Sequence, residues 1–254
     1  MSTAIPSPLL DDLIASWEDQ QTAYIRHRAQ RFEVILDAVS YARPDVRTVL
    51  DIGAGLGSFS KRILARFPEA RVHALDYDPA LLQLARHNLA EHADRVTLIE
   101  ADLRNPDWAG TVGVKPDVVV SSTALHWLPA GKLVALYQML AGLLEPGALF
   151  FNADHLSHSL GTFFHKVGTI DDEHSQAEAF SAGVPDWNDW WSRLRGTEGF
   201  ADLVAERDRR FADDAPENLD TTAVLHTEAL RVAGFAETGT VWQYFDDYVV
   251  YGVR

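Results

Sequence analysis

The chain has 254 residues, 47% hydrophobic and 23% charged, enough for one large α/β domain with an insertion or for two small domains. Its formal net charge of −15 opposes a polyanionic backbone, and no run of lysine and arginine offsets that charge. The absence of cysteine excludes disulfides, zinc–thiolate sites, iron–sulfur clusters and thiol nucleophiles. We therefore expect neither a nucleic-acid partner nor cysteine chemistry.

The N-terminal segment, residues 1–20, has no basic region followed by an apolar core. No other stretch of the sequence approaches the ~18 apolar residues that cross a membrane. These two features predict a soluble protein of the cytoplasm with no membrane partner.

The first half of the chain alternates between short apolar runs and amphipathic segments. Residues 9–40 have apolar positions at helical spacing, which predicts one or two helices before the first strand. The expected strands are residues 48–53, 71–76, 95–102, 117–122 and 148–154. The expected helices between them are residues 58–67, 78–92 and 132–144, of which the second begins with Asp78 as N-cap and Pro79 at the first helical position. This alternation predicts a parallel sheet covered on both faces, with ligands at the carboxyl ends of its strands.

The pattern changes after residue 154. Residues 155–218 contain three of the seven tryptophans and have helical spacing without a clear strand. Residues 222–235 again form an amphipathic helix, and residues 237–254 have two β-rich runs around an Asp-Asp pair, which predicts an antiparallel hairpin. We therefore divide the chain into an N-terminal helical cover (1–43), an α/β core (44–154 and 219–254) and an inserted aromatic-rich lid (155–218).

A glycine-rich loop follows the first expected strand. A loop that binds a dinucleotide reads GxGxxG and holds the pyrophosphate at the N-terminus of a helix, but here Ser58 occupies the position of the last glycine. Gly53 and Gly55 permit a ligand to approach the backbone closely, and Asp51 can accept a hydrogen bond from an ammonium group. This combination fits a ligand with an amino-acid end.

Acidic residues also end the next two strands. Asp76 is suited to accept hydrogen bonds from two ribose hydroxyls, and Asp102 to accept one from the exocyclic amine of a base whose ring lies against Leu103. Taken singly, each acid fits a helix cap or a solvated turn equally well. Together with Asp51 they surround a cationic or neutral ligand, which favours a sulfonium nucleoside over a pyrophosphate.

These motifs resemble those of the class I S-adenosylmethionine-dependent methyltransferases. The matching segments, in chain order, are LDIGAGLG, ALDYDPALL, IEADL and DVVVSSTALHWLP. The likeness covers roughly residues 45–153 and 219–254, and SSTALHWLP is further similar to small-molecule enzymes of the trans-aconitate methyltransferase type. The resemblance implies a Rossmann-like fold with a seven-stranded, mostly parallel sheet and a reversed C-terminal strand. It also implies S-adenosyl-L-methionine as cofactor and S-adenosyl-L-homocysteine as product.

The resemblance assigns the parts of the cofactor to particular residues. The loop of Gly53, Ala54 and Gly55 would hold the methionine part, to which Ser121 would also lie close, and Tyr77 would cover one face of the adenine. The full set of expected cofactor contacts is Tyr24, Arg28, Asp51, Gly53, Ala54, Gly55, Asp76, Tyr77, Asp102, Leu103 and Ser121. Tyr24 and Arg28 fit an ordinary amphipathic helix face equally well.

Three histidines are candidates for proton transfer. His126 follows the fourth strand, near where a donated methyl group would project, and an imidazole titrates close to neutral pH. The alternative is that LHW only begins a helix under the lid. His155 and His158 are candidates to line the acceptor pocket, and with Asp154 they match no established metal-binding spacing, so we expect no metal.

The aromatic insertion determines the expected acceptor, because insertions over strand ends usually define the substrate. We expect in-line methyl transfer to an oxygen, nitrogen or carbon of a small aromatic or apolar molecule, as in secondary metabolism. One alternative is carboxyl O-methylation of a small organic acid. A more remote one is an NAD-dependent oxidoreductase, against which Ser58 argues. A homodimer is also expected.

Overall fold

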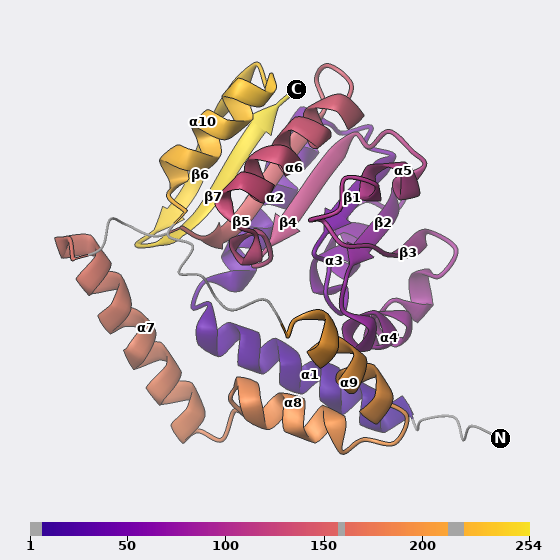
Figure 1. Cartoon of the computed structure of the whole chain (residues 1–254), viewed down its shortest axis with the longest axis vertical. Coiled ribbons are helices and arrows are strands. Elements are labelled where there is room, and N and C mark those ends of the chain that lie inside the picture. Colours follow the sequence, from indigo (N-terminus) through magenta and orange to yellow (C-terminus); the bar gives the residue numbers. More distant parts are fainter. Residues whose placement is uncertain (1–6, 157–160, 213–220) are drawn as a thin grey trace.

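The computed structural model describes residues 7–156, 161–212 and 221–254. One seven-stranded sheet forms its centre, in the order β3-β2-β1-β4-β5-β7-β6 (Figure 1). Its strands are β1 (Thr48–Ile52), β2 (Arg71–Asp76), β3 (Val96–Glu100), β4 (Val118–Ser122), β5 (Leu149–His155), β6 (Glu237–Tyr244) and β7 (Asp247–Val253). The pairs among β1 to β5 are parallel, whereas β7 is antiparallel to both of its neighbours. The expected mostly parallel sheet with a reversed C-terminal strand is confirmed.

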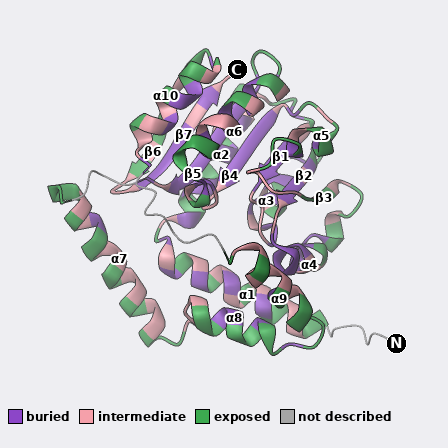
Figure 2. Cartoon of the chain, in the orientation of Figure 1, coloured by how far each residue is buried: buried purple, intermediate pink, exposed green. Residues whose placement is uncertain are grey.

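Helices cover both faces of the sheet. The described helices are α1 (Ser7–Tyr24), α2 (Arg28–Ala42), α3 (Ser58–Arg66), α4 (Pro79–Asn88), α5 (Trp108–Val112), α6 (Ala130–Leu143), α7 (Phe163–Ser181), α8 (Trp187–Arg195), α9 (Ala201–Arg210) and α10 (Ala223–Ala233). Of these, α1, α7, α8 and α9 lie beyond the strand ends rather than on a face of the sheet (Figure 1). One hydrophobic core includes buried residues of α5, α6 and α10, and a second includes buried residues of α2, α3 and α4. Because successive side chains of a strand point to opposite faces, β1 contributes Leu50 to the first core and Val49 to the second. Figure 2 shows the central strands β1, β4, β5 and β7 as mostly buried, whereas the edge strands β3 and β6 have only intermediate and exposed residues.

Helix α4 begins as the sequence predicts, with Asp78 as its N-cap and Pro79 as its first residue. The side chain of Asp78 accepts hydrogen bonds from the backbone N–H of Ala80 and Leu81, as an N-cap does. The helix then ends at Asn88, and a short 3₁₀ turn, η1 (Ala90–His92), replaces its expected last turn. The LHW segment likewise forms only one 3₁₀ turn, η2 (Leu125–Trp127).

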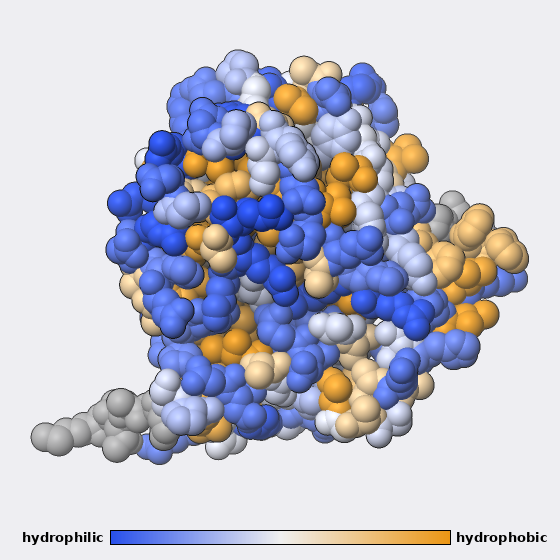
Figure 3. Space-filling view, turned by 180° about the vertical axis from the view of Figure 1, so that it is seen from behind, coloured by the Kyte–Doolittle hydropathy of each residue, from blue (hydrophilic) through white to orange (hydrophobic). Residues whose placement is uncertain are grey.

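A third hydrophobic core joins the insertion to the N-terminal helix. The rings of Trp17 in α1 and Trp190 in α8 lie 4.6 Å apart, and the indole N–H of Trp190 donates to the backbone carbonyl of Leu13. The tryptophans of the insertion therefore pack on α1. Phe163 and Phe164 are instead 73% and 54% exposed, and Figure 3 shows hydrophobic surface at this protruding part of the molecule.

In the described parts of the chain, none of the helices has both the length and the apolar character needed to cross a membrane.

Replacing Trp190 with alanine should lower the free energy of unfolding by about 3–5 kcal/mol, because its side chain is fully buried between α1 and α8. Tyr41→Ala is the matched control: its ring is 87% exposed, so we expect a change within about 0.5 kcal/mol. Urea denaturation of the two variants would measure both values. If Trp190→Ala lowered the free energy of unfolding no more than Tyr41→Ala does, the packing of Trp190 in the third core would not contribute to stability.

Candidate active site

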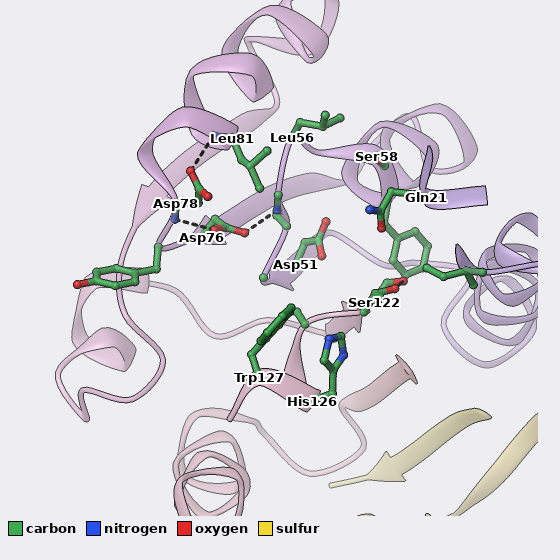
Figure 4. Close-up of a pocket in the computed structure, with 18 of the residues that line it drawn as sticks. Gln21, Asp51, Leu56, Ser58, Asp76, Asp78, Leu81, Ser122, His126 and Trp127 are labelled. Carbon is green, nitrogen blue, oxygen red and sulfur yellow. Dashed lines mark hydrogen bonds between the residues drawn. The ribbon is translucent and has the colours of Figure 1, made fainter. Parts of the chain in front are cut away.

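A cavity of about 860 Å³ opens at the carboxyl ends of the strands, where the strand order reverses between β1 and β4 (Figure 4). Its floor consists of the loops that follow β1, β2, β3 and β4, and α1 contributes Trp17, Gln21 and Tyr24 to its wall. Ligand sites measure roughly 300–1,000 Å³. This cavity is therefore large enough for a nucleoside together with a small second molecule.

The glycine loop forms the part of the floor after β1. Gly53, Gly55 and Gly57 have φ values of +68°, +56° and +83°, in the left-handed region that favours glycine. A Cβ atom on Gly53 would lie 2.3 Å from the Cβ of Ala124, so glycine is also needed for the close contact between the loops after β1 and β4. The backbone N–H groups of Gly53 and Ala54 donate to the carbonyl of Leu75, which holds this loop against β2.

Asp76 joins the glycine loop to the end of β2. One carboxylate oxygen accepts a hydrogen bond from Gly55 N–H at 2.6 Å, and the other accepts from Asp78 N–H at 2.8 Å. Because each carboxylate oxygen has two lone pairs, both oxygens can accept one more hydrogen bond. This geometry is compatible with the expected pair of ribose hydroxyls.

Asp51 lies behind the loop in a nearly solvent-free position. Its carboxyl group accepts a hydrogen bond from the Ser60 hydroxyl at 2.6 Å. Burial raises the pKa of Asp51 to about 7, and the neighbouring charge of Asp76 acts in the same direction. A cation bound near Asp51 would favour the ionised carboxylate.

The expected base-binding residues line the cavity, but they already have cationic partners. Asp102 forms an ion pair with Arg104 at 2.8 Å, beside Leu103. The guanidinium groups of Arg104 and Arg210 lie 5.3 Å and 4.9 Å from the centre of the Tyr77 ring. Sequence reasoning missed both arginines, although Arg104 is only two positions from Asp102.

The two expected contacts from the N-terminal helices also line the cavity. The Tyr24 hydroxyl accepts a hydrogen bond from the backbone N–H of Trp187 in α8, at 3.1 Å. Arg28 forms an ion pair with Glu18, whose carboxylate also binds the Ser58 hydroxyl at the first residue of α3. Glu18, which sequence reasoning missed, therefore fastens α1 to the glycine loop.

Ser121 does not reach the cavity, which corrects the expectation for this residue. Its side chain is fully buried and donates to the backbone carbonyl of Ile52 at 2.9 Å, between β4 and β1. The next two residues, Ser122 and Thr123, line the cavity instead. Thr123 has a φ of +55°, an unusual conformation for a β-branched residue.

His126 and Asp154 form a hydrogen-bonded pair at the β4–β5 side of the cavity. The Nδ1 atom of His126 lies 2.6 Å from one oxygen of Asp154, and the backbone N–H of His126 donates to the other oxygen. Burial alone would raise the pKa of Asp154, but His126, His155 and Arg31 together lower it to about 2. A permanently charged Asp154 fixes the His126 ring with Nδ1 as donor and Nε2 as acceptor.

A second pair, His155 and Asp247, lies beside the first, with Nδ1 of His155 3.0 Å from the carboxylate. Burial opposes protonation of His155, but its bond to Asp247 outweighs this effect and raises its pKa. Asp247 also binds the buried guanidinium of Arg31 at 2.9 Å, which in turn donates to Thr123. His158, the third candidate, lies outside the described residues.

Among the residues that the structure describes, no cluster of three or more histidine or acidic side chains could hold a metal ion.

The strand order, the reversed β7 and the cavity at the switch point define the fold of the class I S-adenosylmethionine-dependent methyltransferases. Residues 49–147 match a family described as "Methyltransferase domain". Two solved structures share this fold. One is S-adenosylmethionine-dependent methyltransferase SibL, with a TM-score of 0.55 and 20% identity over 88% of this chain and 54% of its own. The other is human N-acetylserotonin methyltransferase, with a TM-score of 0.53 and 14% identity over 94% of this chain and 56% of its own.

Curated relatives that are similar to this chain in sequence are also named as methyltransferases. A trans-aconitate 2-methyltransferase from Rhodopseudomonas palustris (strain BisB18) is 32% identical over 151 residues, which are 57% of this chain and 54% of the relative. A ribosomal RNA small subunit methyltransferase H from Mycolicibacterium paratuberculosis (strain ATCC BAA-968 / K-10) is 32% identical over 228 residues, or 82% of this chain and 56% of the relative. The chain spans about half the length of the curated relatives it matches. These findings together support the fold of the class I S-adenosylmethionine-dependent methyltransferases for this chain and a match to the methyltransferase domain family over residues 49–147.

The raised pKa of Asp51 predicts that a ligand with an ammonium group beside this carboxyl binds in a pH-dependent way. Since a ligand ammonium favours the ionised carboxylate, S-adenosylhomocysteine should bind about tenfold more tightly at pH 8 than at pH 6, with release of a proton. Asp51→Asn should remove this dependence, which calorimetric titration in buffers of different ionisation enthalpy would measure. Asp172→Asn, a cavity carboxyl outside the glycine loop, is the control that should keep it. A wild-type affinity that does not change over this range would contradict the assignment.

Proposed function

We propose that this protein transfers a methyl group from S-adenosylmethionine to a small molecule bound in the same cavity. The observation that supports this proposal is the division of one continuous cavity into two chemically different halves. On one side, Asp51 lies in β1, Asp76 ends β2 and Asp102 follows β3. On the other side, His126 in the turn after β4 pairs with Asp154 of β5. A cationic donor fits the first half, and an acceptor that must lose a proton fits the second.

In the donor half, the proposed contacts follow the chemistry of each residue. Asp76 would accept hydrogen bonds from the ribose hydroxyls, while Asp51 and the loop from Gly53 to Gly55 would hold the methionine end. Asp102 and Leu103 would bind the adenine edge and ring. Tyr77 would contribute an aromatic surface that it shares with Arg104 and Arg210.

In the acceptor half, His126 would act as general base. A lone pair of the acceptor oxygen, nitrogen or carbon forms the new bond to the methyl carbon, while the carbon–sulfur bond breaks and its electron pair stays on sulfur. The proton of the acceptor passes to Nε2 of His126, and the charged Asp154 stabilises the imidazolium that forms. The leaving thioether is neutral, so the alignment of donor and acceptor supplies much of the rate.

A dinucleotide fits this loop poorly. A pyrophosphate would need the N-terminus of α3, but the Glu18 carboxylate binds Ser58 there and would repel a second anion. This contact disfavours the oxidoreductase alternative. The net charge of −15 supports a small molecule over an RNA acceptor, despite the ribosomal RNA enzyme among the relatives. We also propose a cytoplasmic location and a homodimer, as expected from the sequence.

His126→Ala should lower kcat about 10²- to 10⁴-fold, because general base catalysis typically contributes that much, and should leave the affinity for S-adenosylhomocysteine unchanged. Transfer of a radiolabelled methyl group to a panel of small phenols, amines and carboxylic acids would identify an acceptor and measure this rate. His87→Ala removes a histidine whose carboxylate partner, Asp11, is exposed and which does not line the cavity, so it should keep full activity. If His126→Ala turned over as fast as the wild type, this histidine would have no part in the mechanism.

A further inference from the structure

The acceptor half of the cavity ends against α7 and the turn between β6 and β7. His155, Asp172, Gln176 and Asp246 line this end. Asp246 lies in the turn that joins the last two strands, and Asp172 and Gln176 lie on α7. The proposed donor-binding acids lie at the carboxyl ends of β1, β2 and β3, so these residues are on the opposite side of the strand-order reversal.

A glycine brings α7 onto this turn. A Cβ atom on Gly168 would lie 3.2 Å from the carboxylate of Asp246, so the helix backbone packs directly against that side chain. Residues four positions apart share one face of a helix, which aligns Gly168, Asp172 and Gln176 along the face toward the cavity. The carboxylates of Asp172 and Asp246 therefore lie at the same corner.

The basic residues of the cavity are engaged by other partners. Its three lining arginines, Arg28, Arg104 and Arg207, form ion pairs with Glu18, Asp102 and Asp78, respectively.

The basic groups at the acceptor end of the cavity are also engaged by another partner. Arg31 and His155 are close enough to act on Asp246 and Asp172, respectively, but both bond to Asp247.

The carboxylates of Asp172 and Asp246 differ from these basic groups in their bonding. Within the described residues, neither side chain makes a hydrogen bond or an ion pair. Burial and, next, the charge of Asp246 raise the pKa of Asp172 to about 6, against a smaller opposite effect of His155. Two carboxylates that repel each other in a ligand cavity favour a ligand that carries positive charge.

We propose that the methyl acceptor carries a protonated amino group, which Asp172 and Asp246 bind, while its nucleophilic atom faces His126. This inference rests on the proposed function and specifies its substrate class. An acceptor such as trans-aconitate, a polycarboxylic acid, would bring like charge to this corner, and the arginines that could compensate are already paired. Tyr24, Ile25 and Trp127 also line the cavity, and their aromatic and aliphatic side chains could contact an apolar body of the acceptor.

The test compares probes that differ only in the charge of one end. Tyramine and 4-hydroxyphenylacetate share a phenol ring, and histamine and imidazole-4-acetate share an imidazole. Each would be titrated calorimetrically into the protein saturated with S-adenosylhomocysteine. At least one amine should bind ten times or more tightly than its carboxylate counterpart. Asp172→Asn should reduce that preference at least fivefold.

Asp171→Asn is the matched control, because it also removes one negative charge from α7. The Asp171 carboxylate pairs with Arg26 and does not line the cavity. It should keep the preference for the amine. The proposal is overturned if no amine binds more tightly than its counterpart, or if the two variants behave alike. Binding of S-adenosylhomocysteine by itself, and methyl transfer to the bound amine, report separately on the proposed function.

Discussion

The reversal of strand order between β1 and β4 is the constraint on which the site depends. The loops after these two strands turn to opposite sides of the sheet, so a cavity opens between them and every neighbouring strand end contributes to its floor. The two loops still touch at one point, where Gly53 lies so close to Ala124 that a side chain at position 53 would collide. Glycine at position 53 therefore permits the close approach of the loops after β1 and β4.

The pKa of a buried carboxyl group is shifted in opposite directions in the two halves of the cavity. Asp51 has only a hydroxyl partner, so burial dominates and its pKa rises to about 7. Asp154 is equally buried, but two imidazoles and a guanidinium outweigh burial and lower its pKa to about 2. The first carboxyl can thus gain its charge when a cationic ligand arrives, whereas the second is always charged and orients a base. In the proposed mechanism, Asp51 would therefore serve donor binding and Asp154 would serve proton transfer through His126.

The predictions that the structure confirms were based on patterns among residues that are close together in the sequence. The parallel strands follow from apolar runs, and the start of α4 follows from Asp78 and Pro79, because both depend on neighbouring residues alone. The expected acids at the ends of β1, β2 and β3 do line the cavity. Glu18, Asp172 and Asp247 could not be anticipated, because each acts on residues brought near only by the fold, as Asp247 does on Arg31, 216 positions away. The aromatic insertion was recognised by its composition, and it does contribute to the cavity: Trp187 and Trp191 pack on α1 and also line it. The carboxylate of Asp172, in the α7 part of the same insertion, was not anticipated as a lining group.

The glycine loop and Asp76 form the proposed binding site for a nucleoside with an amino-acid end. Calorimetric titration of the whole chain with S-adenosylhomocysteine and, separately, with NAD would test this assignment. We expect one S-adenosylhomocysteine bound per chain, little or no binding of NAD, and a clear loss of affinity in Asp76→Ala, which removes both proposed acceptors for the ribose hydroxyls. Binding of NAD alone, or an S-adenosylhomocysteine affinity that Asp76→Ala leaves unchanged, would contradict it.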